Sequence, residues 1–179
     1  MERNTVVLVD QEDKELGIME KISAHEEGVL HRAFSVFIFN EKQELLLQQR
    51  SHTKYHGGGL WTNTCCSHPQ MGEDVLAAAQ ERLGFEMGMY CDLEFSHTFI
   101  YNIKVENDLI EHELDHVYLG VTDHQPAINV DEVQDFKWIS IQSVLQDIEE
   151  NSSKYTFWFK EALPKVLTYF QNRHKYGFE

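Results

Sequence analysis

The chain has 179 residues, 42% of them hydrophobic, and a formal net charge of −15 at pH 7. This size and apolar content fit a single compact domain with a sizeable core, which we expect to span residues 1–179. The negative charge argues against a general binder of nucleic acids or anionic membranes, because neutralising phosphates requires many accessible lysines and arginines. An anionic ligand must therefore meet a local basic cluster or a metal ion.

Two β-hairpins are predicted near the start of the chain. Each combines two β-prone apolar runs joined by a short polar link. The first pairs residues 5–9 with residues 15–21 across a turn, and the second pairs residues 31–39 with residues 44–49. We expect these strands to form the central sheet.

A loop and a helix follow the second hairpin. Residues 51–60 contain Gly57-Gly58-Gly59 and form a flexible loop of the kind that often lines sites. The helix is introduced by Gly72-Glu73-Asp74, since acidic residues are favoured in a first turn, and Gly88 is its natural stop. Its apolar stripe consists of Val75, Leu76, Ala79 and Leu83.

A third hairpin, a short strand and two closing helices are predicted in the second half of the chain. The hairpin joins residues 93–105 and 109–121 across a polar turn, and the strand covers residues 136–139. The helices cover residues 141–149 and 157–175, the second with Phe159, Leu163, Val166 and Phe170 on its apolar side. The alternation of strands and helices predicts an α/β sandwich without internal repeats or a disordered linker.

The N-terminus and the cysteines predict a cytoplasmic protein with reduced thiols. Met1-Glu2-Arg3-Asn4 lacks the apolar core of a signal peptide, and no apolar run approaches the length of a membrane span. Three cysteines are an odd number, and two of them, Cys65 and Cys66, are adjacent, which is a poor basis for a disulfide framework.

Three histidines and two glutamates are candidates for a metal site: His25, His31, His68, Glu111 and Glu113. Side chains two apart on a strand share a face, so both glutamates are expected to point the same way. Imidazole and carboxylate donors together suit Zn²⁺, Mn²⁺, Fe²⁺ or Mg²⁺, and the donor types alone do not choose among them.

A lone histidine is weak evidence for a ligand, because most histidines are surface or hydrogen-bonded residues. Seven others in this chain illustrate the point: His52, His56, His97, His112, His116, His124 and His174. His112 and His116 are also expected to face away from the two glutamates on the same strand.

Residues 67–88 match a Nudix box imperfectly. The full pattern begins with glycine and carries Arg-Glu and Glu-Glu pairs, whereas this chain has Ser67, Glu81-Arg82 and Phe85-Glu86. The acidic cluster that would hold Mg²⁺ against a diphosphate is thinned to Glu86, with Glu73 nearby. Taken alone, this element is equally well explained by an ordinary amphipathic surface helix.

When the metal-site candidates and the segment 67–88 are considered together, nearly the whole chain resembles the type I isopentenyl-diphosphate isomerases, which are Nudix-fold enzymes. The residues that carry the resemblance are His25 to Ser35, Thr62-Asn63-Thr64-Cys65-Cys66-Ser67-His68-Pro69, Glu111-His112-Glu113 and Trp158-Phe159. Cys65 and Ser67 resemble the eukaryotic-type branch of that family. The resemblance implies a Nudix-like α/β/α sandwich (α+β), with a mixed central sheet and an N-terminal β-hairpin.

The implied activity is the interconversion of isopentenyl and dimethylallyl diphosphate by protonation and deprotonation of the alkene. By this similarity, Cys66 and Glu113 are the acid/base groups on opposite faces of the substrate. Tyr101 matches a position beside Glu113, and Trp158 matches one that stabilises the carbocation-like species. Which of Cys66 and Glu113 adds the proton and which removes it is left open, as is the role of Cys65.

The resemblance also implies the binding partners of the site. Basic residues gather around the diphosphate, namely Lys21, Arg50, Lys54 and Arg82. Mg²⁺ carried with the substrate meets Glu86, and the histidines and glutamates of the metal site hold one tightly bound divalent ion (Zn²⁺, Mn²⁺ or Mg²⁺). The expected partner is a small-molecule diphosphate, with no nucleic acid and no membrane. The oligomeric state is open, with a monomer favoured.

Two alternatives differ in chemistry. A Nudix pyrophosphohydrolase shares the fold and Mg²⁺, but it would use a fuller set of helix glutamates to activate water. Phe85 and the Glu81-Arg82 order argue against this alternative. A non-catalytic metal-binding regulatory domain would keep the histidines but would need neither Cys66 nor Trp158.

Overall fold

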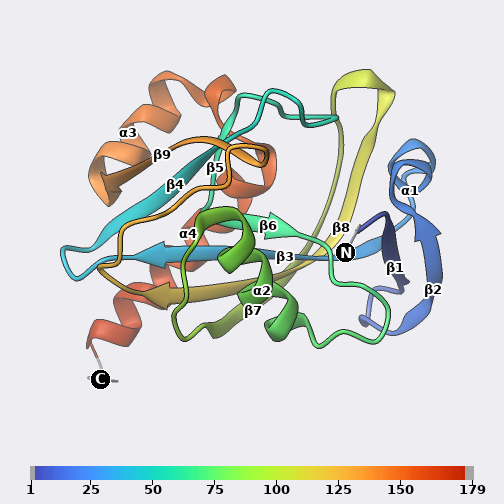
Figure 1. The fold of residues 1–179 in the computed structure, drawn as a ribbon, viewed down its shortest axis with the longest axis horizontal. Coiled ribbons are helices and arrows are strands. Elements are labelled where there is room, and N and C mark those ends of the chain that lie inside the picture. Colours follow the sequence, from blue (N-terminus) through green and yellow to red (C-terminus); the bar gives the residue numbers. More distant parts are fainter. Residues whose placement is uncertain (1–2, 176–179) are drawn as a thin grey trace.

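A computed structural model describes residues 3–175 of the chain. The described part contains nine strands in one mixed sheet, four α-helices and two short 3₁₀ turns (Figure 1). The strands are β1 (Thr5–Val9), β2 (Glu15–Glu20), β3 (His31–Phe39), β4 (Glu44–Arg50), β5 (Trp61–Thr62), β6 (Cys65–Ser67), β7 (Glu94–Lys104), β8 (Ile110–Val121) and β9 (Val133–Ser140). The helices are α1 (Lys21–Glu27), α2 (Val75–Met87), α3 (Ile141–Glu150) and α4 (Phe157–Lys175), and the 3₁₀ turns are η1 (Glu106–Asp108) and η2 (Ser152–Lys154).

Strand β3 lies at the centre of the sheet. Along one edge it pairs in parallel with β8, from His31 opposite Glu113 to Phe39 opposite Val121. Its other edge is shared among β1, β6 and β4, all antiparallel. Every residue of β3 is buried, because the strand has neighbours on both edges and cover on both faces.

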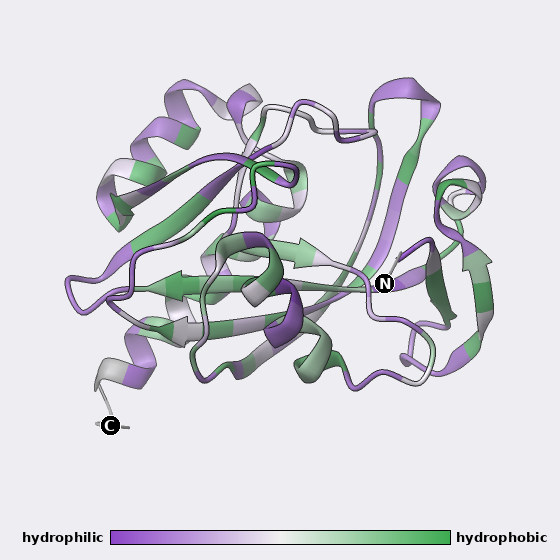
Figure 2. Cartoon of the chain, viewed as in Figure 1, coloured by the Kyte–Doolittle hydropathy of each residue, from purple (hydrophilic) through white to green (hydrophobic). Residues whose placement is uncertain are grey.

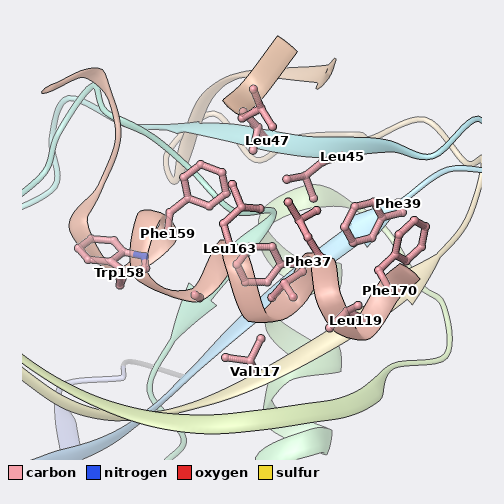
Figure 3. Close-up of a cluster of buried hydrophobic side chains, with 14 of the residues drawn as sticks. Phe37, Phe39, Leu45, Leu47, Val117, Leu119, Trp158, Phe159, Leu163 and Phe170 are labelled. Atoms are coloured by element: carbon pink, nitrogen blue, oxygen red, sulfur yellow. The ribbon is translucent and has the colours of Figure 1, made fainter. Parts of the chain in front are cut away.

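The two faces of β3 belong to two separate hydrophobic clusters. Phe37 and Phe39 pack with α4, where Phe159 and Phe170 stack on them with ring centroids 6.0 and 3.9 Å apart (Figure 3). The alternate residues of β3 pack instead with α2 through Leu83 and its neighbours. Helices therefore cover both faces of a mixed sheet, which confirms the predicted α/β/α sandwich.

The hydropathy of the chain follows this layering. The central strand is largely hydrophobic, whereas hydrophilic residues gather at the tip of the β7–β8 hairpin (Figure 2). The expected apolar side of α4 is buried at Phe159, Leu163, Val166 and Phe170. Within residues 3–175, no helix is both long and apolar enough to cross a membrane.

Most predicted elements are confirmed, with three differences. The strand predicted at residues 15–21 ends at Glu20, whose carboxylate accepts a hydrogen bond from Ser23 N at 2.8 Å and so caps α1. Helix α1 and the short strands β5 and β6 were not predicted. The strand predicted at residues 136–139 is longer, because β9 pairs with β4 from Val133 to Ser140.

The boundaries of α2 agree with the sequence. Asp74 accepts a hydrogen bond from Ala77 N at 2.9 Å and caps the start of the helix. Gly88 ends it in the left-handed conformation, at φ 62°, and its N–H donates to Gly84 O at 3.0 Å. A Cβ atom at Gly88 would lie 2.5 Å from the carbonyl oxygen of Ala127.

Gly88→Ala is therefore expected to lower the free energy of unfolding by about 1–3 kcal/mol, from the left-handed backbone and the close approach together. Gly72→Ala is the matched control, because Gly72 has φ 80° and a Cβ atom added there would have nothing within 4 Å among residues 3–175. Urea denaturation of both variants separates the two contributions. Equal losses at the two positions would show that the contact with Ala127 has no effect.

Candidate active site

One cavity of about 460 Å³ opens beside β3, β6 and β8, which is within the size range of small-ligand sites. Candidates from distant parts of the sequence line it together: Lys21, Arg50, Lys54, Cys66, His68, Arg82, Tyr101, Glu86, Glu111, Glu113 and Trp158. His25 and His31 lie behind this lining and are 0% exposed. Glu73 is the exception, because it lies outside the cavity lining and pairs with Arg3 at 2.8 Å.

The local structure explains how the candidate ligands meet. The parallel register of β3 and β8 places His31 opposite Glu113. Helix α1 carries His25 towards β8, and His68 directly follows β6. Glu111 and Glu113 are two apart on β8 and are both buried on the side of the histidines.

The donor atoms form two groups that share His25. The first consists of His25, His31, His68 and Glu113, and the second of His25, His56 and Glu111; within each group the donor atoms lie within 4.8 Å of one another. The Nε2 atoms of His25 and His31 lie 3.2 and 3.4 Å from Oε1 of Glu111 and Glu113, respectively. His68 Nε2 lies 2.7 Å from Oε1 of Glu113.

The hydrogen bonds of His25 and His31 use Nδ1 and leave the Nε2 atoms free to bind a cation. His25 Nδ1 donates to the carbonyl oxygen of Lys21 at 2.6 Å, and His31 Nδ1 donates to that of Val29 at 2.8 Å. A carbonyl oxygen can only accept, so Nδ1 carries the proton and Nε2 of a neutral ring presents a lone pair. Among the described residues, both Nε2 atoms are buried without a hydrogen-bond partner, as is Glu111 Oε1. Converging lone pairs of this kind fit a divalent cation.

The charges of the site also favour a cation. Burial opposes the charge of Glu113, but His68 and His31 outweigh it and hold the pKa of this carboxyl well below its usual range. Burial likewise opposes the charge of Glu111, yet His25 and His56 leave its pKa lowered. Burial lowers the pKa of His68 to about 4. At pH 7 the carboxylates are therefore ionised and His68 is neutral, as metal ligands must be.

Removing divalent metal with a chelator is expected to lower the melting temperature by about 5–10 °C, from a loss of about 3 kcal/mol of binding free energy at saturating metal. The physical reason is that two buried carboxylates lose their compensating cation. Calorimetry of the chelated and reloaded protein, with metal content measured by mass spectrometry, checks this. Identical melting temperatures with and without bound metal would contradict it.

Cys66 and Glu113 reach the cavity from opposite edges of β3. Cys66 lies on β6 opposite Ser35, whereas Glu113 lies on β8. Burial raises the pKa of Cys66 to about 12 despite the nearby Arg50, so the thiol keeps its proton at neutral pH. Tyr101 Oη donates to Oε2 of Glu113 at 2.6 Å, and burial raises the pKa of Tyr101 well above its usual value.

Trp158 forms part of the cavity wall at the start of α4. Its side chain is 5% exposed and lies at one end of the buried hydrophobic cluster (Figure 3). The guanidinium of Arg50 lies 5.2 Å from the centre of its ring. The indole is therefore already placed against one positive charge at the cavity.

The predicted basic residues form a local positive cluster in an otherwise acidic chain. Burial, followed by the charge of Lys54, lowers the pKa of Lys21. Lys54 pairs with Glu132, and Arg82 pairs with Glu86 at 2.6 Å. Glu86 lies on α2 and is 3% exposed. It belongs to the segment that resembles a Nudix box, it lines the cavity, and its carboxylate is paired with Arg82.

Some cavity residues were missed, and other histidines lie elsewhere. His56, Tyr55 and Glu132 line the cavity without having been predicted, because no local pattern distinguishes them. His112 Nδ1 donates to the carbonyl oxygen of Gly28, and His116 pairs with Asp13, so both face away from the centre as expected. His174 lies in α4, and its side chain is outside the described residues.

Comparison with known proteins adds independent findings. The NUDIX domain model matches residues 29–159. An isopentenyl-diphosphate Delta-isomerase of Pectobacterium atrosepticum is 51% identical over 166 residues, which cover 93% of this chain and 93% of that protein. An isopentenyl-diphosphate Delta-isomerase 2 of Photorhabdus laumondii is 49% identical over 158 residues, or 88% of this chain and 89% of that protein.

Solved structures share the fold at low sequence identity. A crystal structure of a Deinococcus radiodurans protein has a TM-score of 0.68 at 16% identity, covering 82% of this chain and 90% of that one. The NUDIX domain of Shewanella oneidensis NrtR, solved with ADP ribose, has a TM-score of 0.60 at 17% identity, covering 78% of this chain and 86% of that one. These structural similarities confirm the Nudix-like fold.

Proposed function

Since the chain belongs to the isopentenyl-diphosphate Delta-isomerase family of NUDIX-domain proteins, we propose that it interconverts isopentenyl and dimethylallyl diphosphate with Cys66 and Glu113 as the proton-transferring groups. The chain is an isomerase that moves a carbon–carbon double bond within its substrate. The observation that carries the assignment of residues is the approach of a protonated thiol and a carboxylate to one cavity from opposite edges of β3.

The reaction needs one group to add a proton and another to remove one. A proton is added to the terminal alkene carbon, a tertiary carbocation-like species forms, and a proton leaves the neighbouring methylene. Cys66 Sγ holds one proton, and the hydrogen bond from Tyr101 orients Glu113 for the other transfer. His25, His31, His68, Glu111 and Glu113 would hold a divalent ion, which would supply positive charge that fixes the Glu113 carboxylate.

Trp158 supports the same proposal, because an unactivated alkene forms a cation that must be shielded from water. An indole face stabilises a desolvated cation by about 2 kcal/mol. Trp158 is buried at the cavity wall, so its indole is itself largely removed from water. We assign it the role of stabilising the cationic species.

The diphosphate is proposed to bind where Lys21, Arg50, Lys54 and Arg82 converge. Mg²⁺ carried with the substrate is proposed to meet Glu86, and the histidine centre is proposed to hold Zn²⁺, Mn²⁺ or Mg²⁺. We further propose that residues 1–179 act as one domain, as a monomer in the cytoplasm. Size-exclusion chromatography with light scattering tests the monomer.

The product assay distinguishes the isomerase from a pyrophosphohydrolase. Purified protein with Mg²⁺ and isopentenyl diphosphate is expected to form dimethylallyl diphosphate without releasing phosphate or pyrophosphate. Release of either ion in place of the allylic product would overturn the proposal and favour the hydrolase.

A further inference from the structure

Glu132 is an acidic residue of the cavity wall that takes no part in the proposed reaction. It lies just before β9 and lines the cavity together with the basic residues assigned to the diphosphate. Its side chain is 23% exposed, so the carboxylate is partly open to solvent. An acidic side chain among residues that are expected to attract an anion needs a reason, because like charges repel.

Glu132 pairs with two of those basic residues at once. Its Oε2 accepts a hydrogen bond from Nζ of Lys54 and lies 3.5 Å from Nη2 of Arg82. The same Nη2 atom donates to Oε1 of Glu86 at 2.6 Å. The guanidinium of Arg82 is therefore shared between two carboxylates.

Backbone hydrogen bonds keep Glu132 in this position. The N–H of Ser51 donates to the carbonyl oxygen of Glu132 at 3.1 Å, and the N–H of Lys54 donates to that of Ser51 at 3.2 Å. The N–H of Glu132 donates to the carbonyl oxygen of Asn129 at 3.0 Å. The turn before β9 and the loop after β4 are thereby joined, and the Glu132 carboxylate stays within reach of Lys54.

The charges of Glu132 and of the basic cluster act on each other. Burial opposes the charge of Glu132, but Lys54, followed by Arg82 and Lys21, outweighs it and lowers the pKa of this carboxyl. Glu132 in turn favours the charged form of Lys21, whose pKa is lowered by burial and by Lys54. Glu132 is therefore ionised at pH 7, and it supplies negative charge at the place where the diphosphate is proposed to bind.

An anion that enters this cluster has to share Lys54 and Arg82 with Glu132. A diphosphate without a cation carries only negative charge, so Glu132 repels it and competes with it for the same donors. Mg²⁺ reverses the sign of this interaction, because carboxylate and phosphate oxygens are the ligands that it prefers. The same carboxylate therefore opposes the free diphosphate and favours the Mg²⁺-bound form.

We propose that Glu132 is a specificity-determining residue that makes the cavity select a Mg²⁺-bound diphosphate over the free diphosphate. This inference rests on the proposed diphosphate site, and it adds a second carboxylate to Glu86 at that site. An ordinary structural ion pair would instead hold Lys54 in place without distinguishing the two forms of the ligand.

The test measures the affinity of the full-length protein for inorganic pyrophosphate by calorimetry, with and without Mg²⁺. All variants are first loaded with Zn²⁺, so that the histidine centre is the same in both titrations. Glu132→Gln removes the charge and keeps the size of the side chain. Without Mg²⁺ it is expected to bind pyrophosphate about tenfold more tightly than the wild type, because a repelling charge and a competitor for Lys54 are lost. With Mg²⁺ no such gain is expected, since the attraction between carboxylate and cation is lost as well.

Asp131→Asn is the matched control, because Asp131 is the neighbouring residue, is exposed and does not line the cavity. It removes the same charge and is expected to keep the wild-type ratio of the two affinities. An unchanged ratio in Glu132→Gln would overturn the proposal, also when both affinities fall together, as a purely structural role predicts. A wild type without preference for the Mg²⁺ form would overturn it too. A wild type with this preference that forms no dimethylallyl diphosphate would sink the proposed function and leave the inference standing.

Discussion

Replacing Glu113 with glutamine is expected to reduce isomerisation by about 10⁴-fold and to release the divalent ion proposed at the histidine centre. The large effect has two causes. The variant loses the proposed general acid or base, and such a group contributes about 10²- to 10⁴-fold. It also loses the carboxylate charge that faces Nε2 of both His31 and His68 in a buried site. The amide preserves size, so the loss is one of charge and proton transfer.

Turnover and metal content are measured on the same preparation of Glu113→Gln. Glu161→Gln is the control for the chemical change itself, since Glu161 is exposed on α4. Full metal content in Glu113→Gln would show that this carboxylate does not bind the ion. Turnover near the wild-type rate would remove Glu113 from the reaction.

Cys66→Ser is expected to lower turnover by about 10²- to 10⁴-fold while leaving metal content unchanged. Serine keeps the size of the side chain, but its hydroxyl is a far weaker proton donor than a thiol. Cys66 belongs to neither of the two groups of metal donors, so the ion is expected to stay bound. This separation of activity from metal content distinguishes the isomerase from a non-catalytic metal-binding domain.

Cys91→Ser is the matched control for the thiol. Cys91 is also partly exposed and free, and it does not line the cavity. Its variant is expected to retain wild-type turnover. An equal loss in both variants would indicate a general effect on folding, and an active Cys66→Ser protein would exclude the thiol from proton transfer.

The sequence predicts the long elements of the fold well because their patterns are local. The apolar side of α4 and the stop of α2 at Gly88 follow from helical periodicity and left-handed glycine geometry, and both are observed. The β7–β8 hairpin follows from two strands around one polar turn. Each of these signals lies within one stretch of sequence.

The missed elements depend on contacts between distant residues. Helix α1 has seven residues and is too short to carry a clear period. Strands β5 and β6 have two and three residues and exist because β4 and β3 offer them pairing edges. Neither condition can be read from the residues of the short segments themselves.

The functional site also has one part that the sequence predicts and another part that depends on contacts between distant residues. The resemblance places His25, His31, His68 and Glu113 together, and the structure brings their donor atoms within 4.8 Å. His56 has no motif of its own, and it meets Glu111 only because the loop after β4 folds against β8. A contact of this kind depends on the tertiary structure, which is why the sequence positions of the histidines did not reveal it.

The central claim is that this site moves protons on an alkene. The most direct test is incubation of the purified protein with Mg²⁺ and isopentenyl diphosphate in D₂O, followed by mass spectrometry and NMR of the product. The account predicts dimethylallyl diphosphate with deuterium in the methyl group formed at the former terminal alkene carbon. A dimethylallyl product free of deuterium, or no such product, would contradict it.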